Sequence, residues 1–176
     1  MQAIIPVAGA GTRLRPLTYT QPKALIAVAG KPILSFIVDE LQENGVTDFI
    51  FIIGYLGEKI KEFVEREYPN LNAKFVTQEE RLGSSHAIWC ARDVINRNEP
   101  LIIHLGDTIV DIDFKKILAE EYSTVCVKKV EDPRVFGVAE INSDGFITGV
   151  HEKPAIPRSN MAMVGFYFIK ETGALL

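Results

Sequence analysis

A glycine-rich loop near the N-terminus carries the residue types that bind polyphosphates. The loop spans residues 9–23 and contains two glycines, one hydroxyl group that precedes the first arginine, two arginines and a lysine: Gly9, Gly11, Thr12, Arg13, Arg15 and Lys23. Glycines let backbone N–H groups approach phosphate oxygens, and the cations neutralise the phosphate charge. The apolar run 3–8 directly before it is expected to be a buried strand. The sequence therefore predicts a phosphate-binding loop at the end of the first strand.

Two well-known nucleotide motifs do not match this loop. A dinucleotide fingerprint needs a third glycine three residues after Gly11, where this chain has Leu14, and an acidic residue roughly 20 residues further on, which is missing. A P-loop needs Gly-Lys-Ser or Gly-Lys-Thr, a tripeptide that the chain lacks. The loop is therefore neither a dinucleotide-binding loop nor a P-loop, and it is expected to bind phosphate in another way.

Two later strand ends carry side chains suited to a nucleotide. After the predicted strand 73–77, Gln78 offers a donor and an acceptor to the edge of a base, and Gly83 lets backbone amides approach the same ring. Asp107 follows the predicted strand 101–105, where a carboxylate facing a phosphate loop can hold Mg²⁺. Ligands of an open parallel sheet bind beyond the carboxyl ends of its strands, so these loops are expected to share one site.

A predicted hairpin adds an acidic and a basic side chain. Residues 142–145 (Asn-Ser-Asp-Gly) are typical of a turn between the strands 137–141 and 146–152. Glu152 can accept hydrogen bonds from vicinal sugar hydroxyls, and Lys153 can meet a second phosphate. The alternative for this Glu-Lys pair is a solvent-exposed surface pair.

Strands and helices must alternate to position these residues. Strands are expected at 3–8, 48–53, 73–77 and 101–105, and helices at 33–44, 58–68 and 84–95. This alternation predicts βαβ crossovers and a mainly parallel sheet in an α/β protein. From residue 123 onward the strands 123–130, 137–141, 146–152 and 163–169 predict a more mixed sheet portion, and Asp113 is expected to cap a helix. We expect a single domain over residues 1–176 that is incomplete at its C-terminal end, because the last residues 170–176 read as the first turn of a helix.

The bulk composition narrows the function classes. With 176 residues, 47% hydrophobic and 24% charged, the chain suits one globular domain, and its net charge of −4 argues against nucleic acid as a partner. The cations Arg13, Arg15, Lys23 and Lys31 are expected to gather in one cleft. Cys90 and Cys126 are read as buried free thiols, and no signal peptide or membrane segment is recognisable, so a cytoplasmic location is expected.

Taken together, these motifs resemble the sugar-1-phosphate nucleotidyltransferases, also called nucleotide-sugar pyrophosphorylases, and in particular the glucose-1-phosphate thymidylyl- and uridylyltransferases. Five pieces occur in the family's order: Gly9-x-Gly11-Thr12-Arg13 with Pro22-Lys23, Gln78 with Gly83, Gly106-Asp107, Phe136-Gly137-Val138, and Glu152-Lys153-Pro154. The resemblance implies a Rossmann-like nucleotidyltransferase fold and Mg²⁺-dependent transfer of a nucleotidyl group to a sugar 1-phosphate. It also allows a homo-oligomer.

The same resemblance implies a role for each residue. The nucleotide would be bound by Ala8, Gly9, Gly11, Thr12, Arg13, Gln78 and Gly83. The sugar phosphate would be bound by Thr108, Gly137, Glu152, Lys153 and Met163. Arg13, Lys23, Asp107 and Lys153 would be catalytic, with Asp107 as the metal ligand. No general base is expected, because a phosphate nucleophile is already ionised near neutral pH.

Departures from the family's pattern leave alternatives open. Ala8 and Ala24 stand where thymidylyl-specific members usually have Gly and Gln, and the family's second metal-binding carboxylate has no counterpart before Leu176. UTP or dTTP is favoured, since Gln78 can pair with a pyrimidine imide, and glucose 1-phosphate is the expected acceptor. The alternatives are a non-catalytic nucleotide- or sugar-phosphate-binding module, or a transferase acting on mannose 1-phosphate with GTP or on a phosphorylated amino alcohol.

Overall fold

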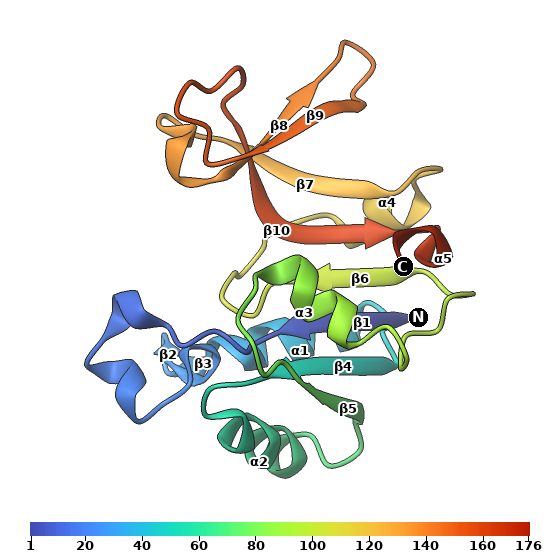
Figure 1. Ribbon diagram of the computed structural model, residues 1–176. Helices are drawn as coiled ribbons and strands as arrows, with labels where there is room; N and C mark the ends of the chain where they lie inside the picture. Colours follow the sequence, from blue (N-terminus) through green and yellow to red (C-terminus); the bar gives the residue numbers. More distant parts are fainter.

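The computed structural model describes residues 1–176 and is built around one eight-stranded sheet (Figure 1). The strand order is β5-β4-β1-β6-β10-β8-β9, with β7 paired to β10. The strands are β1 (Gln2–Pro6), β2 (Ala27–Val28), β3 (Lys31–Pro32), β4 (Asp48–Ile53), β5 (Asn72–Thr77), β6 (Leu101–His104), β7 (Thr124–Lys129), β8 (Gly137–Ile141), β9 (Ile147–Glu152) and β10 (Met161–Ile169). The α-helices are α1 (Ile33–Glu43), α2 (Gly57–Glu67), α3 (Ser84–Cys90), α4 (Phe114–Ala119) and α5 (Thr172–Leu175), and short 3₁₀ helices are η1 (Thr12–Leu14), η2 (Leu17–Tyr19), η3 (Lys23–Leu25) and η4 (Pro133–Val135).

The parallel half of the sheet creates the crevice in which a ligand would bind. β1 lies between β4 and β6 and pairs with both in parallel, while β5 pairs in parallel with the far side of β4. The chain thus adds strands on one side of β1 and then crosses to the other side for β6. Such a reversal of strand order opens a crevice between the loops that leave the two strands. Here those loops begin at residues 7 and 105.

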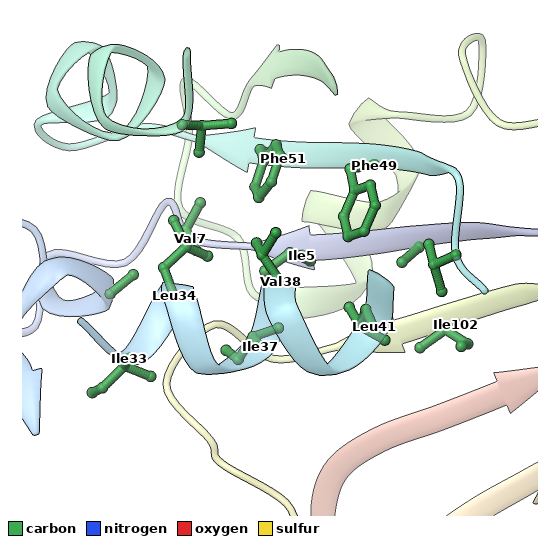
Figure 2. Close-up of a cluster of buried hydrophobic side chains, with 14 of the residues drawn as sticks. Ile5, Val7, Ile33, Leu34, Ile37, Val38, Leu41, Phe49, Phe51 and Ile102 are labelled. Atoms are coloured by element: carbon green, nitrogen blue, oxygen red, sulfur yellow. The ribbon is translucent and has the colours of Figure 1, made fainter. Parts of the chain in front are cut away.

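Alternating side chains of the central strands fill two cores on opposite faces of the sheet. Ile5, Phe49 and Phe51 lie in the core beneath α1 and α2, as Figure 2 shows for the α1 part. Ile4 and Ile50 point to the opposite face, where α3 covers them. The unbroken apolar run of β4 is therefore explained by burial on both faces, and each such side chain contributes about 1.5–3 kcal/mol of hydrophobic stabilisation.

The antiparallel half carries the hairpin. β10 runs opposite to β6 and also pairs with β7 and β8, and its register shifts between Met163 and Tyr167. β8 and β9 form the predicted hairpin, and its turn is held by Asn142, whose Oδ1 accepts hydrogen bonds from the N–H groups of Asp144 and Phe146. Because β10 is antiparallel, its first residues lie at the same edge of the sheet as the carboxyl ends of β1 and β6 (Figure 1).

Two predictions need correction. The helix predicted over 84–95 ends at Cys90, and the chain continues as tight turns in which the N–H groups of Ala91, Arg92 and Val94 donate to carbonyls three residues earlier. Cys90 and Cys126 are free thiols as expected, yet both are only half-buried. The short antiparallel pair β2–β3 inside the N-terminal segment was not predicted.

Asp113 caps α4 as predicted, accepting from the Lys116 N–H. None of the helices has the length and apolarity needed to cross a membrane.

Candidate active site at the carboxyl edge of the sheet

The glycine-rich loop leaves β1 in a tightly folded form. Gly11 has φ +59°, a left-handed conformation, and a Cβ there would lie 2.8 Å from Thr18 Cγ2. The Thr18 hydroxyl donates to the Gly11 carbonyl at 2.8 Å, which fixes the loop from within. Gly9 differs, since a Cβ there would meet nothing within 4 Å. The loop therefore presents open space at Gly9 and a fixed backbone at Gly11.

A first cavity, of about 230 Å³, lies where the base of a nucleotide was predicted to bind. Its lining includes Ala8 and Gly9 from the loop after β1, and Gln78 and Gly83 from the loop after β5. The structure thus brings four of the predicted nucleotide-binding residues into one cavity. Arg81 also lines it. Arg81 was overlooked by the sequence analysis, although its place between Gln78 and Gly83 in the same loop was a usable signal.

Hydrogen bonds fix the orientation of the Gln78 amide. Its Nε2 donates to the Gly83 carbonyl at 3.0 Å and lies 3.1 Å from His86 Nδ1. Because the carbonyl requires a donor, Nε2 must face it, and His86 Nδ1 then acts as an acceptor. The Oε1 atom of Gln78 forms no hydrogen bond within the protein and is not among its fully buried polar atoms. Gln78 therefore offers an acceptor to a ligand, and His86, which sequence alone left without a role, supports it.

A second cavity, of about 160 Å³, lies at the crevice between β1 and β6. Its lining includes Gly9, Lys23, Gly106 and Asp107. Lys23 Nζ forms an ion pair with Asp107 Oδ2, and both side chains remain about one-third or more exposed (33% and 44%). Gly106 allows this close approach of the two strand ends, since a Cβ there would lie 2.3 Å from Val7 Cγ1 and 2.9 Å from the Pro6 carbonyl oxygen. Gly9 lines both cavities, so they adjoin at the phosphate loop.

The surroundings of Asp107 suit a cation that is bound mainly by a substrate. The Asp107 carboxylate accepts from the Thr108 hydroxyl at 3.4 Å, and no group of three or more acidic, histidine or cysteine side chains forms a ready-made metal site. Mg²⁺ typically keeps several waters and uses one or two carboxylates together with substrate phosphates. One exposed carboxylate beside a phosphate loop fits that mode and does not fit a metal cage made by the protein alone.

A buried histidine lies just before the Asp107 loop. His104 is completely buried in β6 and packs edge-on against Phe166 with the ring centroids 5.5 Å apart. Burial lowers its pKa, while a hydrogen bond to the Leu105 carbonyl and the charge of Asp107 oppose the shift. Its Nε2 has no hydrogen-bond partner. His104 is therefore a structural residue whose burial favours the neutral form.

The predicted sugar-side residues form a row across three strands. Gly137 of β8 pairs with Glu152 of β9. A Cβ at Gly137 would lie 2.7 Å from Met163 Cε of β10 and 3.1 Å from Glu152 Oε2. Lys153 follows with φ +43°, donates its N–H to the Phe136 carbonyl, and forms an ion pair with Glu152 at 2.9 Å. This row therefore gathers Gly137, Glu152, Lys153 and Met163, at the sheet edge from which the phosphate loop also extends (Figure 1).

Some predicted residues lie outside these groups. Thr12 and Arg13 are exposed on the loop, where the Arg13 side chain makes no ion pair, and Thr108 donates a hydrogen bond to Asp107 and none to a sugar-side residue. Lys31 does not join the cation cluster, because it pairs with Asp39 and lies over the ring of Phe36. No hydrogen bond or ion pair joins the Gly137–Glu152 row to Asp107, so the sheet edge alone relates the two groups.

Comparison with known proteins identifies the family. Residues 2–174 match the family model described as nucleotidyl transferase. The chain is 35% identical over 174 residues to the UTP–glucose-1-phosphate uridylyltransferase AglF of Haloferax volcanii, covering 95% of this chain and 71% of that protein. It is 33% identical over 174 residues to the low-salt glycan biosynthesis nucleotidyltransferase Agl11 of the same organism and 32% identical over 173 residues to a glucose-1-phosphate thymidylyltransferase of Streptomyces griseus. In both cases the match covers 95% of this chain and 48% of the relative, so the chain spans about half the length of these two proteins.

Solved structures share the fold. A Bacillus anthracis protein described as a glucose-1-phosphate thymidylyltransferase superposes with a TM-score of 0.86 at 27% identity, over 99% of this chain and 73% of that one. A UDP-glucose pyrophosphorylase in complex with UDP-glucose superposes with a TM-score of 0.82 at 24% identity, over 96% and 75%. The α/β architecture predicted from the sequence is thereby confirmed. With the family model, these relatives and the fold in agreement, the chain belongs to the nucleotidyl transferase family, among the sugar nucleotidyltransferases.

Proposed function

We propose that this chain transfers a nucleotidyl group from a nucleoside triphosphate to a sugar 1-phosphate, giving a nucleoside-diphosphate sugar and pyrophosphate. One observation carries the proposal: three groups of side chains, each suited to one part of the substrates, lie at the same edge of the sheet. Gln78 and Gly83 line a base cavity, Gly9, Lys23 and Asp107 line the adjoining phosphate crevice, and Glu152 begins the sugar-side row. Names of relatives that contain glucose 1-phosphate support glucose as the sugar.

The reaction would be a direct displacement at the α-phosphorus. An oxygen of the sugar 1-phosphate forms a new bond to this phosphorus, the bond to the bridging oxygen of the β-phosphate breaks, and pyrophosphate leaves with that electron pair. The attacking phosphate is ionised near neutral pH, so no side chain has to remove a proton. Alignment and charge neutralisation are then the main contributions of the protein.

The residues divide this work between them. Arg13, exposed and free of ion pairs, is available to the triphosphate, and backbone N–H groups around Gly9 and Gly11 can contact the same phosphates. In the structure Lys23 is paired with Asp107. When the nucleotide binds, Lys23 would turn to the reacting phosphates and Asp107 would hold Mg²⁺, which supplies further neutralisation of phosphate charge. Lys153 would bind the phosphate of the sugar, and Glu152 its hydroxyls.

The acceptor atom of Gln78 favours a pyrimidine imide as the base. Uracil and thymine present a ring N–H that can donate to an oxygen at the position of Gln78 Oε1; guanine presents one as well, whereas adenine has none on its pairing edge. The thymidylyl- and uridylyltransferases among the relatives favour the pyrimidines over guanine. We therefore propose UTP or dTTP as the nucleotide. Gln78→Glu keeps an acceptor but adds charge and removes the donor to the Gly83 carbonyl, so it is expected to weaken UTP and dTTP binding more than ATP binding.

The experiment is pyrophosphate release with Mg²⁺ over a grid of nucleoside triphosphates and sugar 1-phosphates. The expected result is release with UTP or dTTP and glucose 1-phosphate, abolished by Asp107→Ala. Asp111→Ala is the matched control, because Asp111 is an exposed carboxylate on the same segment that lines neither cavity. Absence of release for every pair, with nucleotide binding retained, would overturn the catalytic proposal in favour of a binding module.

A further inference from the structure

Tyr55 connects the two loops that the nucleotide would contact. It lies between β4 and α2, and its hydroxyl donates to the backbone carbonyl of Tyr19 in the phosphate loop at 3.1 Å. The guanidinium carbon of Arg81, a residue of the base cavity, lies 5.8 Å from the centroid of the Tyr55 ring. One side chain thus contacts the base loop with its ring and the phosphate loop with its hydroxyl.

Tyr19 in turn contacts Arg15, one of the cationic residues of the phosphate loop. The guanidinium carbon of Arg15 lies 5.1 Å from the centroid of the Tyr19 ring, so the Tyr19 backbone that Tyr55 holds also positions an arginine. The path runs from Arg81 through Tyr55 and Tyr19 to Arg15. The two Arg–aromatic contacts are of modest strength because both arginines are exposed.

The backbone that carries Tyr55 is fixed, whereas the loops it touches are exposed. A Cβ at Gly54 would lie 2.9 Å from Ala8 Cβ, so this turn packs directly against the exit of β1. Leu56 adopts a left-handed conformation with φ +56°, and the Gln78 N–H donates to the Ile53 carbonyl at 2.8 Å. Arg15, Tyr19 and Arg81 are all exposed. Tyr55 therefore has a fixed backbone and connects side chains that are exposed.

We propose, as an extension of the proposed function, that Tyr55 is a positioning residue that couples base binding to phosphate binding. A base in the cavity fixes Arg81, Arg81 fixes the Tyr55 ring, and the Tyr55 hydroxyl then holds the phosphate loop in the binding conformation. The ligand that binds first bears the entropy cost of ordering these exposed side chains, so the second ligand binds more tightly. By reciprocity, pyrophosphate must favour nucleoside binding by the same factor.

Lys59 gives an internal comparison. Its Nζ donates to the Thr20 carbonyl at 2.7 Å, one residue beyond the Tyr55 contact, but the structure records no contact between Lys59 and Arg81. Removal of Lys59 is therefore expected to weaken phosphate binding without changing the coupling, whereas removal of the Tyr55 hydroxyl is expected to change the coupling itself.

The test is calorimetric titration of pyrophosphate with and without saturating uridine or thymidine, in the presence of Mg²⁺. For the unmodified protein we expect the nucleoside to tighten pyrophosphate binding about fivefold, the contribution of one ordinary hydrogen bond. In Tyr55→Phe the ring stays and the hydroxyl is lost, so the ratio should fall to about one. Lys59→Met should bind pyrophosphate more weakly and keep the ratio. Tyr122→Phe is the matched control, since Tyr122 is an exposed tyrosine packed against Phe146 near the hairpin and should change neither quantity.

The outcomes separate this inference from the proposed function. If neither nucleoside nor pyrophosphate binds, the proposed function and the inference both fail. If both bind but the unmodified protein shows a ratio of one, or if Tyr55→Phe keeps the full ratio, the coupling is refuted while nucleotide binding stands. An equal loss in Tyr122→Phe would show that the effect is not specific to Tyr55 and would also refute it. Melting temperatures measured for every variant exclude loss of folding as the cause.

Discussion

Gly9→Ala separates binding from stability at the phosphate loop. Gly9 lines both the base cavity and the Asp107 crevice, and a Cβ there would contact nothing within 4 Å. Its φ lies outside the left-handed range, so alanine is tolerated by the backbone. Replacing such a glycine restricts the unfolded chain and is expected to raise the free energy of unfolding by about 0.4–1 kcal/mol.

The binding effect has the opposite sign. If a phosphate or sugar of the nucleotide fills the space at Gly9, the added methyl group clashes with it, and either the ligand or the loop must shift. Inserting a methyl group into an occupied site costs about 1–3 kcal/mol, and 2 kcal/mol corresponds to roughly 30-fold weaker binding. We therefore expect a protein that melts at the same or a higher temperature and binds UTP or dTTP about 30-fold more weakly.

Gly106→Ala is the contrasting variant, because its Cβ would lie 2.3 Å from Val7 Cγ1 and 2.9 Å from the Pro6 carbonyl oxygen. The backbone oxygen cannot move away without disturbing β1. We expect a loss of about 2 kcal/mol in unfolding free energy, and for a chain of this size that lowers the melting temperature by roughly 4–8 °C.

Thermal unfolding and calorimetric nucleotide titration of both variants supply the data. Unchanged nucleotide affinity in Gly9→Ala would refute the assignment of this open space to the nucleotide. A melting temperature of Gly106→Ala equal to that of the unmodified protein would refute the close packing of the two strand ends.

Three further predictions concern the sugar row, pH and metal. Gly137→Ala places a Cβ 2.7 Å from the flexible end of the Met163 side chain, so folding should be little affected while KM for the sugar 1-phosphate rises about tenfold. Gly149→Ala on the same hairpin is the control, because its Cβ would make only ordinary contacts at 3.5 Å or more, and it should leave KM unchanged. Equal KM values for the two variants would contradict the assignment of Gly137 to the sugar side. Burial lowers the pKa of His104, so as the pH falls the unfolded chain binds a proton at this histidine before the folded protein does. The free energy of unfolding should therefore be highest above about pH 6.5 and decrease below it. Urea unfolding should show a smaller decrease in His104→Leu, and an equal decrease would exclude His104 as the cause. Equilibrium dialysis should show Mg²⁺ retained with nucleotide and hardly at all without it, and tight binding to the free protein would contradict a substrate-bridged metal.

The sequence was informative wherever a local pattern sufficed. A strand was predicted over 48–53 and is present, and its run of apolar residues fits because neighbouring side chains of β4 alternate between two cores. Asn142 predicted the hairpin turn, since its side chain bonds to the backbone only two and four residues away. The strand-end positions of Gln78 and Asp107 were also readable, because parallel strands bring their carboxyl ends to one edge.

Tertiary structure decided which side chains meet. Lys31 stands in the same basic segment as Lys23, but only Lys23 reaches Asp107, since Lys31 pairs with Asp39 of α1. The helix over 84–95 was predicted too long: it ends at Cys90, and the turns that follow lead to Asn96, whose N–H donates to Gln2, more than 90 residues away in the chain. The link from Arg81 through Tyr55 to the phosphate loop could not be read from spacing either, since it joins three loops from three strand ends. Local periodicity and turn chemistry determine the helices, strands and turns of this protein. Which side chains pair with one another depends on distances between segments that are far apart in the chain, and these distances exist only once the sheet has formed.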